Sequence, residues 1–425
     1  MSIKNGQYKY RKEEKMEDIK EIANKIKEEG GRLYLVGGAV RDSILGRKVK
    51  DRDYCVTGIS SDEFKNLFPE AYTRGKKFEV FDINGNEFAI ARTEKKHGVG
   101  HKEFQIQTGK EITIEQDLSR RDITINSIAQ DVLTGELIDP FAGLQDIKNS
   151  IIRATTNAFS EDPLRVYRVA RFAAELNFKV EEDTIKLMNK LKGELDTLSK
   201  ERVFVEFSKA LSTNKPSIFF EVLRKAEVLE IHFKEIYDLI GSLQPEKYHP
   251  EGDSYKHTML ALDKSAELTE SKEIRFATLV HDLGKGITPK EEYPHHYNHE
   301  VKGIPVVEKF CKRVNVPNSW MKCGKTACRE HMRGGIFYKM KPAKKVDFIE
   351  RVAKSYLGLH GLQIVVISDK SSSRNIDKGS IDFETIGNEV LSKINGEYIK
   401  EKYNIKEGLK VKEKLREERI KYITK

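Results

Sequence analysis

The segment 32–56 constrains the fold most, because a strand, a Gly-Gly turn, a short helix and a second strand follow one another directly. The apolar run 32–36 leads into Gly37 and Gly38, and a short helix is expected over 39–45. Glycines let a backbone approach a phosphate closely, and the free N–H groups at a helix start attract anions. The segment therefore predicts an α/β head able to bind a phosphate-bearing ligand, although an ordinary strand-to-helix turn has the same pattern.

Two carboxylates lie just downstream, at Asp51 and Asp53 on the expected strand 51–56. Side chains alternate along a strand, so both aspartates would project from one face while Arg52 points away. Adjacent carboxylates repel each other unless a cation lies between them, and Mg²⁺ prefers such oxygen ligands. A D-x-D pair alone is more often a solvated strand end, but the Gly-Gly turn and Arg41 upstream favour phosphoryl or nucleotidyl transfer.

The rest of the chain divides into a strand-rich first part and a helical remainder. Further strands are expected at 78–83, 87–92 and 104–108, and the pattern is mainly helical from about residue 115. Ahead of the first strand, residues 11–30 form an amphipathic pattern whose apolar face holds Ile19, Ile22, Ala23 and Ile26.

Three arginines are spaced by three on an expected helix that begins near Pro163. Arg165, Arg168 and Arg171 follow Asp162, and together they form a drifting stripe on one side of the helix. Asp162 could simply cap the helix in front of Pro163, but a cap does not explain three cations that would repel one another without an anion. A carboxylate can accept from the exocyclic amine of cytosine or adenine, which uracil lacks. Asp162 with Arg165 could therefore select C and A, and both roles of Asp162 can hold together.

Most of the eleven histidines lie between residues 249 and 331, and an adjacent His-Asp pair follows an apolar helix. Imidazoles and carboxylates together suit a divalent transition metal, which acidifies bound water and polarises a phosphoryl group. The candidates, in chain order, are His257, His281, Asp282, His295, His296, His299, His331 and Asp369.

Composition sets wider limits on the function. The chain has 425 residues and a net charge of +9, which favours a polyanionic partner or reflects solubilising lysines. No apolar run is long enough for a membrane span and the N-terminus has no apolar signal segment, so we expect a cytoplasmic protein without a membrane partner. The last 25 residues hold more Lys and Arg than acids and are expected to be solvated or to touch RNA.

The segment LVGGAVRDSILGR followed by KVKDRDYCV resembles the nucleotidyltransferase signature of class II CCA-adding enzymes and bacterial poly(A) polymerases. The resemblance implies that Gly38 and Arg41 contact the nucleotide, and that Asp51 and Asp53 are catalytic and hold Mg²⁺. It extends to Arg121, with Asp122 in support, as a contact to the sugar. It also extends to the EDxxRxxRxxR element, which implies nucleotide-binding roles for Asp162, Arg165, Arg168 and Arg171.

The second half resembles the HD phosphohydrolases, and the order of the pieces resembles bacterial CCA-adding enzymes that carry an HD domain. The resemblance implies a divalent transition metal, with Ni²⁺ as a candidate, held by His257, His281, Asp282 and Asp369. His299 and His331 would complete a second metal site, and His295 and His296 would line the pocket. Phosphatase, 2′-nucleotidase and 2′,3′-cyclic phosphodiesterase activities are implied in the same way.

We therefore expect an α+β protein: a nucleotidyltransferase head with a mostly antiparallel sheet, then a helical neck and a helical HD body. The expected parts are an N-terminal extension (1–31), the head (32–150), the neck (151–240), the HD body (241–385) and a basic tail (386–425). The expected activity is addition of CCA to tRNA from CTP and ATP, by a monomer or a homodimer. A poly(A) polymerase, a CC-only or A-only enzyme, or an HD phosphohydrolase with an RNA-binding head remain alternatives; the charged segment 92–115 favours terminal A addition by resemblance.

Overall fold

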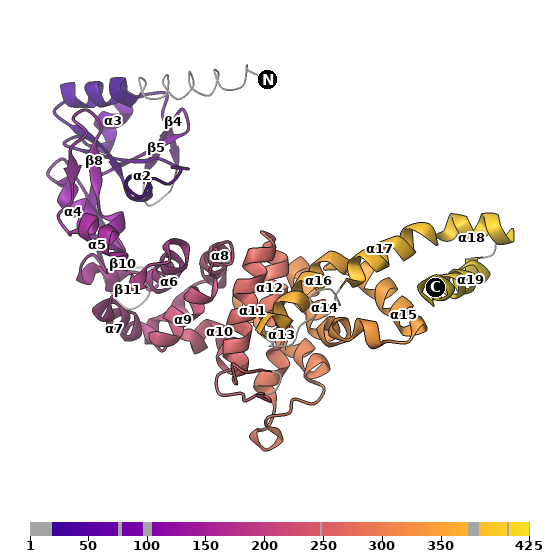
Figure 1. Ribbon diagram of the computed structural model, residues 1–425. Coiled ribbons are helices and arrows are strands. Elements are labelled where there is room, and N and C mark those ends of the chain that lie inside the picture. The colour runs from indigo at the N-terminus through magenta and orange to yellow at the C-terminus, as the bar shows by residue number, and fades with distance from the viewer. Residues whose placement is uncertain are drawn as a thin grey trace. The chain divides into compact units, whose positions relative to one another are not determined.

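The computed structural model divides the chain into two compact units, Met1–Leu198 and Ser199–Lys425. It describes residues 19–74, 79–96, 104–246, 249–372, 382–405 and 408–424 (Figure 1).

A seven-stranded sheet forms the centre of the first unit, in the order β3-β4-β5-β2-β1-β8-β9. Within this sheet only the pair β2–β5 is parallel, and every other neighbouring pair is antiparallel. The mostly antiparallel head is thus confirmed. The strands are β1 (Arg32–Val36), β2 (Asp53–Thr57), β3 (Tyr72–Arg74), β4 (Val80–Ile83), β5 (Asn86–Ile90), β8 (Ala129–Asp131) and β9 (Leu137–Ile138).

Both faces of this sheet are covered, because alternate residues of β1 and β2 enter two different hydrophobic clusters. Leu33 and Val56 pack in one cluster with the helix at residues 19–28 and with α3 (Ser61–Leu67). Tyr34 and Cys55 pack in the other, with α4 (Ile114–Ser119). The period of two therefore sets which face each side chain of β2 joins. The apolar face predicted for the N-terminal helix is confirmed for Ile19, Ile22, Ala23 and Ile26, while residues 11–18 lie outside the described ranges.

Two strand predictions and the prediction of a helical neck need correction. The strand expected over 51–56 begins only at Asp53, so Asp51 precedes it. The strand expected over 87–92 ends at Ile90, and Arg92 instead begins β6 (Arg92–Lys96), which pairs with β7 (Phe104–Thr108). Two residues each from β10 (Ile151–Ile152) and β11 (Lys179–Val180) pair in parallel, so the neck is not helical throughout. Such short pairs carry too little periodicity to be found from sequence.

The remaining helices of the first unit follow the sheet in sequence, apart from one short helix after β1. They are α2 (Gly38–Ile44), α5 (Gly143–Asn149), α6 (Arg165–Leu176) and α7 (Glu182–Lys190), with a 3₁₀ turn at Asn157–Glu161 before α6.

The second unit is helical over its described residues. Its helices are α8 (Lys200–Ala210), α9 (Ser217–Lys225), α10 (Leu229–Tyr237), α11 (Ser254–Leu268), α12 (Lys272–Val280), α13 (His299–Val314), α14 (Asn318–Gly335), α15 (Pro342–Ala353), α16 (Gly358–Asp369), α17 (Phe383–Lys393), α18 (Gly396–Tyr403) and α19 (Gly408–Thr424). Helix α14 packs against α12, α13, α15 and α16 (Figure 1). None of the described helices is both long and apolar enough to span a membrane.

Aromatic packing joins the helices of this unit, from α8 onward, into one core. The buried ring of Phe207 on α8 lies 5.4 Å from Phe233, 6.4 Å from Phe276 and 6.2 Å from Phe310, centroid to centroid. Aromatic rings at such separations form one core, so helices before and after residue 241 share it.

The basic C-terminal segment is folded rather than freely solvated. Helix α19 packs on α15, and Arg416 and Arg419 pair with Asp347 and Glu350 at 3.0 and 2.7 Å. The Arg419 guanidinium also donates to the carbonyl oxygen of Ile394. Part of the positive charge predicted for solvent or RNA is therefore neutralised within the unit.

Candidate functional site

Asp53 is the first residue of β2, where it pairs with Val36 on one side and Glu87 on the other. Alternation places its side chain on the same face as Cys55, the face that α4 covers. Surrounding protein atoms and the like charge of Asp51 raise the pKa of Asp53, and Arg121 opposes the shift. Asp51 precedes the strand, so strand alternation does not determine where its side chain points. The prediction that both aspartates share one face by alternation therefore does not apply to Asp51.

Arg121 is held at the end of α4 by a buried carboxylate. Asp117 accepts from Arg120 at 2.5 Å through one oxygen and from Arg121 at 3.0 Å through the other. Burial alone would raise the pKa of Asp117, but the two guanidinium groups lower it to about 2. The carboxylate is thus charged at neutral pH and fixes Arg121 beside Asp53.

The two glycines of the Gly-Gly turn differ in backbone conformation, and only Gly37 has a positive φ that would be strained with any other residue. Gly37 has φ +69°, and a Cβ there would lie 3.0 Å from Nη1 of Arg121. Gly38 has only an ordinary contact, 3.6 Å from a Cβ to Nη2 of Arg41. Arg41 is itself buried and donates to the Asn126 side-chain oxygen at 2.6 Å. The turn therefore brings Gly38, Arg41 and Arg121 to one region of the head.

Asp122 joins the head to α6. Its buried carboxylate accepts from Arg168 Nε at 2.8 Å and from Asn126 at 3.1 Å. Burial would raise the pKa of Asp122, but Arg168 and Asn126 hold it well below its ordinary value. Sequence reasoning treated Asp122 only as support for Arg121, whereas its partner in the structure is Arg168.

The proposed base-selecting pair makes contacts within the chain. Helix α6 begins at Arg165, two residues after Pro163, and an Asp162 side-chain oxygen accepts from the Leu164 N–H at 3.0 Å. The buried Arg165 guanidinium donates to the carbonyl oxygens of Ala158 and Arg120. Asp162 thus forms a local turn and not the expected helix cap, because the N-cap residue of α6 is Leu164. Arg165 is oriented by backbone carbonyls.

Repulsion along the arginine stripe is relieved by carboxylates of the chain itself, so no external anion is needed to explain it. Arg171 pairs with Glu175 at 2.5 Å, as Arg168 pairs with Asp122. The guanidinium carbons of Arg41, Arg168 and Arg171 also lie 5.1, 5.4 and 3.7 Å from the ring centroid of Phe172. The buried Phe172 ring is therefore shared by three guanidinium groups.

In the second unit, four predicted metal ligands converge from α11, the end of α16 and the residues that follow α12. His257 lies on α11, Asp369 ends α16, and His281 with Asp282 follows α12. One ligand atom from each lies within 4.8 Å of the others. His257 Nε2 is 2.9 Å and His281 Nε2 is 3.4 Å from Oδ1 of Asp369.

A second group shares Asp282. Its Oδ1 lies 3.2 Å from Nε2 of His299 and 3.3 Å from Nε2 of His331, at the start of α13 and on α14. The structure therefore brings together all six proposed ligands. His295 and His296 join neither group, and the His296 nitrogens lie within hydrogen-bonding distance of Thr288 and the Leu243 carbonyl.

The donor set fits a divalent cation. The buried His281 Nε2 and both Asp282 oxygens have no hydrogen bond of normal geometry among the described residues, although Lys285 Nζ pairs with Oδ2 at 2.5 Å. Burial would lower the pKa of His281, but Asp282 and Asp369 raise it to about 10, so the site attracts positive charge. Buried imidazoles and carboxylates brought together in this way are the ligand types that suit a divalent transition metal.

Two residues that the sequence reasoning missed orient this site. Glu251 Oε1 lies 2.6 Å from Nδ1 of His257, which fixes the ring so that Nε2 faces the cluster. Lys285 Nζ lies between Asp282 and the side-chain oxygen of Gln244, 2.5 Å from each. Both lie in segments that the resemblance covers, six residues before His257 and three after Asp282. Glu251 also groups with His249 and His257 at metal-ligand distances, a grouping that the sequence reasoning did not propose.

These two sites define a nucleotidyltransferase head of the polymerase type joined to an HD phosphohydrolase unit. Three families match along the chain: the poly A polymerase head domain (residues 33–153), the probable RNA and SrmB-binding site of polymerase A (177–239) and the HD domain (254–356). The chain belongs to the family of multifunctional CCA proteins. It is 43% identical to the multifunctional CCA protein of Shewanella denitrificans over 359 residues, 82% of this chain and 86% of the relative. It is 48% identical to that of Shewanella frigidimarina over 296 residues, 68% and 71% of the two chains.

Solved structures share the fold. The apo form II of a CCA-adding enzyme superposes with a TM-score of 0.66 at 20% identity, covering 96% of this chain and 91% of the other. The Thermotoga maritima CCA-adding enzyme complexed with tRNA gives 0.65 at 21% identity, covering 94% and 89%. Both the head and the HD domain belong to classes that depend on divalent metals.

Proposed function

We propose that this chain adds C, C and A to the 3′ end of tRNA, using CTP and ATP and releasing pyrophosphate. The observation that carries the proposal is the position of Asp53, at the start of β2 and electrostatically coupled to Arg121, in a chain of the multifunctional CCA family. The tRNA 3′-oxygen attacks the α-phosphorus of the nucleotide. The bond from that phosphorus to the bridging oxygen of the β-phosphate breaks, and pyrophosphate leaves.

Asp51 and Asp53 would hold Mg²⁺, which supplies positive charge for the phosphates. The N–H groups at the start of α2, with Gly38, Arg41 and Arg121, bind the triphosphate and sugar. Since Arg41 already donates to Asn126, it is oriented before the nucleotide arrives.

Base selection uses Asp162 and Arg165. The carboxylate accepts from the exocyclic amine of C or A, and Arg165 exchanges one of its carbonyl acceptors, on Ala158 or Arg120, for the base. Arg168 and Arg171 complete the binding surface from the same helix, with Asp122 and Glu175 as their counter-charges.

The second unit is a metal-dependent phosphohydrolase. His257, His281, Asp282 and Asp369 would hold one divalent transition metal, for which Ni²⁺ is a candidate, and His299 and His331 would hold another with Asp282. The metal supplies an activated water for attack on a phosphoester. We infer a cytoplasmic location, where immature tRNA and both nucleotides are found.

The decisive assay offers the purified chain a tRNA that lacks its CCA end, together with each nucleotide separately and in combination. Two C residues followed by one A are expected. A run of A without C would identify a poly(A) polymerase, and addition that stops at CC or begins only after CC would identify a partial enzyme.

Two variants separate the activities. Asp53→Ala should abolish nucleotide addition and leave phosphoester hydrolysis, and His281→Ala should do the reverse. His295→Ala, an exposed histidine outside both ligand groups, serves as the matched control. Addition that survives Asp53→Ala would refute the assignment of the head, and a loss of both activities in either variant would refute two separate sites.

A further inference from the structure

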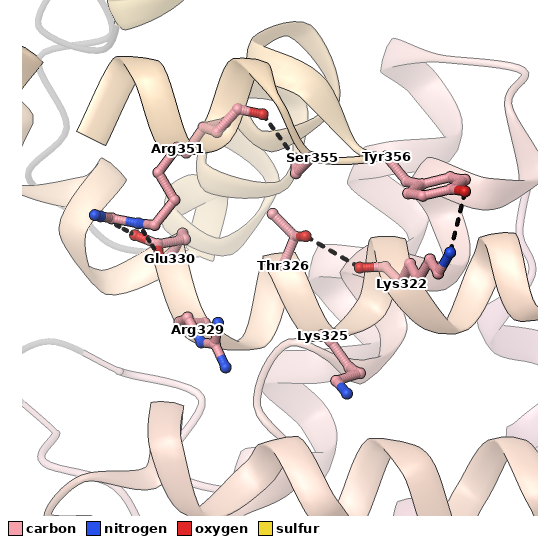
Figure 2. A pocket seen from close by; sticks show the side chains of 9 residues that line it. Lys322, Lys325, Thr326, Arg329, Glu330, Arg351, Ser355 and Tyr356 are labelled. Atoms are coloured by element: carbon pink, nitrogen blue, oxygen red, sulfur yellow. Dashed lines mark hydrogen bonds and ion pairs between the residues drawn. The ribbon is translucent and has the colours of Figure 1, made fainter. Parts of the chain in front are cut away.

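A basic pocket in the second unit lies outside both sites described above. It has a volume of about 270 Å³ and is formed by α14, α15 and the turn after α15 (Figure 2). Its lining combines cations, hydroxyl groups and one aromatic ring: Lys322, Lys325, Thr326, Arg329, Glu330, Arg351, Val352, Ser355 and Tyr356.

The charges of this pocket do not balance. Glu330 is buried and holds Arg351 through two contacts of 2.7 and 2.9 Å, and Glu308 outside the pocket pairs with Lys325. Over the described residues, neither Lys322 nor Arg329 has a carboxylate within ion-pair distance, and Figure 2 shows no partner for Arg329 among the residues drawn. Two cations are thus left for an anion from outside.

The aromatic ring of Tyr356 is placed to take part. It is 64% exposed, and Lys322 Nζ lies 4.2 Å from its centroid and 3.0 Å from its hydroxyl oxygen. Exposed rings interleaved with lysine and arginine are typical of surfaces that bind RNA, where bases stack and phosphates meet cations.

Helix α14 carries this pocket and the HD site on different faces. Residues 322, 325, 326 and 329 recur at helical spacing, whereas His331 is about 200° around the helix from Arg329, at roughly 100° per residue. A polymer held in the pocket therefore leaves the ligand cluster on the other side of α14 uncovered.

We propose that this pocket binds the phosphodiester backbone of the tRNA substrate, an inference that rests on the proposed function. The open lining with its two cations fits consecutive phosphates of a polynucleotide. The chain as a whole, with a net charge of +9, also attracts a polyanion. Free phosphate shares this chemistry, so the test must separate the two sources.

The test compares the full-length chain with the double variant Lys322→Ala/Arg329→Ala in binding a tRNA that lacks CCA, across a series of salt concentrations. Affinity should fall about tenfold and the salt slope by about two, because two phosphate contacts are lost. The matched control, Lys309→Ala/Lys354→Ala, removes two exposed lysines outside the pocket and should bind as the wild type does. Unchanged affinity and slope in the pocket variant, or equal losses in the control, would overturn the proposal.

Inorganic phosphate is the second probe. If the pocket variant loses phosphate binding while its tRNA affinity is unchanged, the pocket is a small-anion site and the proposal fails. In the addition assay, the pocket variant should have a raised KM for tRNA and an unchanged kcat. One further outcome separates the two proposals. If the wild type adds no nucleotide, but the pocket variant still binds tRNA more weakly than the wild type, the proposed function is refuted and this inference stands.

Discussion

Asp117 lies buried between Arg120 and Arg121, and its two oxygens accept from both guanidinium groups. Its role shows how a residue with no contact to substrate can determine where a binding residue lies. Without the carboxylate, Arg121 would lose the contact that holds it beside Asp53, and two adjacent guanidinium groups would face each other unneutralised.

We predict that Asp117→Asn destabilises the first unit by about 2 kcal/mol at neutral pH, since its pKa falls from 3.8 to about 2. A folded-state pKa below the unfolded value gives stability that is present above about pH 3.8 and disappears as the pH falls toward 2. Unfolding midpoints of wild type and variant, measured from pH 7 down to pH 2, should therefore approach each other below about pH 3.8 and converge near pH 2. Asp62→Asn, at an exposed helix position, is the control, and a difference independent of pH would contradict the assignment.

Residue types could be predicted well at this scale, but their partners could not. The six HD ligands and Asp53 stand out because imidazoles and carboxylates recur at positions with chemical meaning. Arg168 was expected to meet a phosphate or the base-selecting pair, and nothing in the sequence indicated that within the chain it pairs with Asp122, 46 residues away. Pairings over such distances are set by the packing of α6, which no local pattern contains.

At the scale of elements, the Gly37-Gly38 turn holds two glycines for different reasons. Gly37 needs its positive φ, and a Cβ would meet Arg121, whereas a Cβ on Gly38 would have only ordinary contacts. Gly37 is therefore required for the backbone to fold, whereas we attribute Gly38 to the approach of a ligand.

Gly37→Ala is predicted to cost about 1–2 kcal/mol of stability and to displace Arg121, because the left-handed backbone is strained with a Cβ. Gly38→Ala should leave the unfolding midpoint near that of wild type and raise the KM for CTP and ATP, because a methyl group blocks the approach of a phosphate. Thermal unfolding and steady-state kinetics of the two variants test both effects. The account fails if Gly37→Ala is as stable as wild type, or if Gly38→Ala has a normal KM.

Elements with strong apolar periodicity could be predicted from the sequence. Short elements, and elements that are stabilised mainly by tertiary contacts, could not. The strand 32–36 and the helix around residues 19–28 follow from apolar spacing. Strand β7 was predicted at its observed bounds, whereas its partner β6 lies in a charged segment without clear alternation. Helix α19 is stabilised by Arg419, Glu350 and the Ile394 carbonyl rather than by its own pattern. Tertiary contacts of this kind override local composition.

At the scale of the whole molecule, each unit has its own hydrophobic core, one around the sheet and one around the Phe207 and α14–α16 helices. The proposed metal ligands of the HD site all lie within the second unit, and Asp53, Arg121 and Asp122 all lie within the first. A substitution at one site should consequently change the unfolding temperature of the unit that contains it and leave that of the other unit unchanged.

We therefore expect two unfolding transitions in calorimetry. The Gly37→Ala variant should lower the midpoint temperature of the first unit's transition only, which identifies that transition. Removal of divalent metal with a chelator, in the absence of nucleotide, should lower only the other transition. A metal present at a hundredfold excess over its Kd stabilises by about 2.7 kcal/mol, which for a unit of this size corresponds to roughly 5–10 °C. His281→Ala should abolish the effect of the chelator, whereas His295→Ala should retain it. A chelator that shifts the first transition equally, or neither transition, would show that the clustered histidines and carboxylates do not hold a metal that the fold depends on.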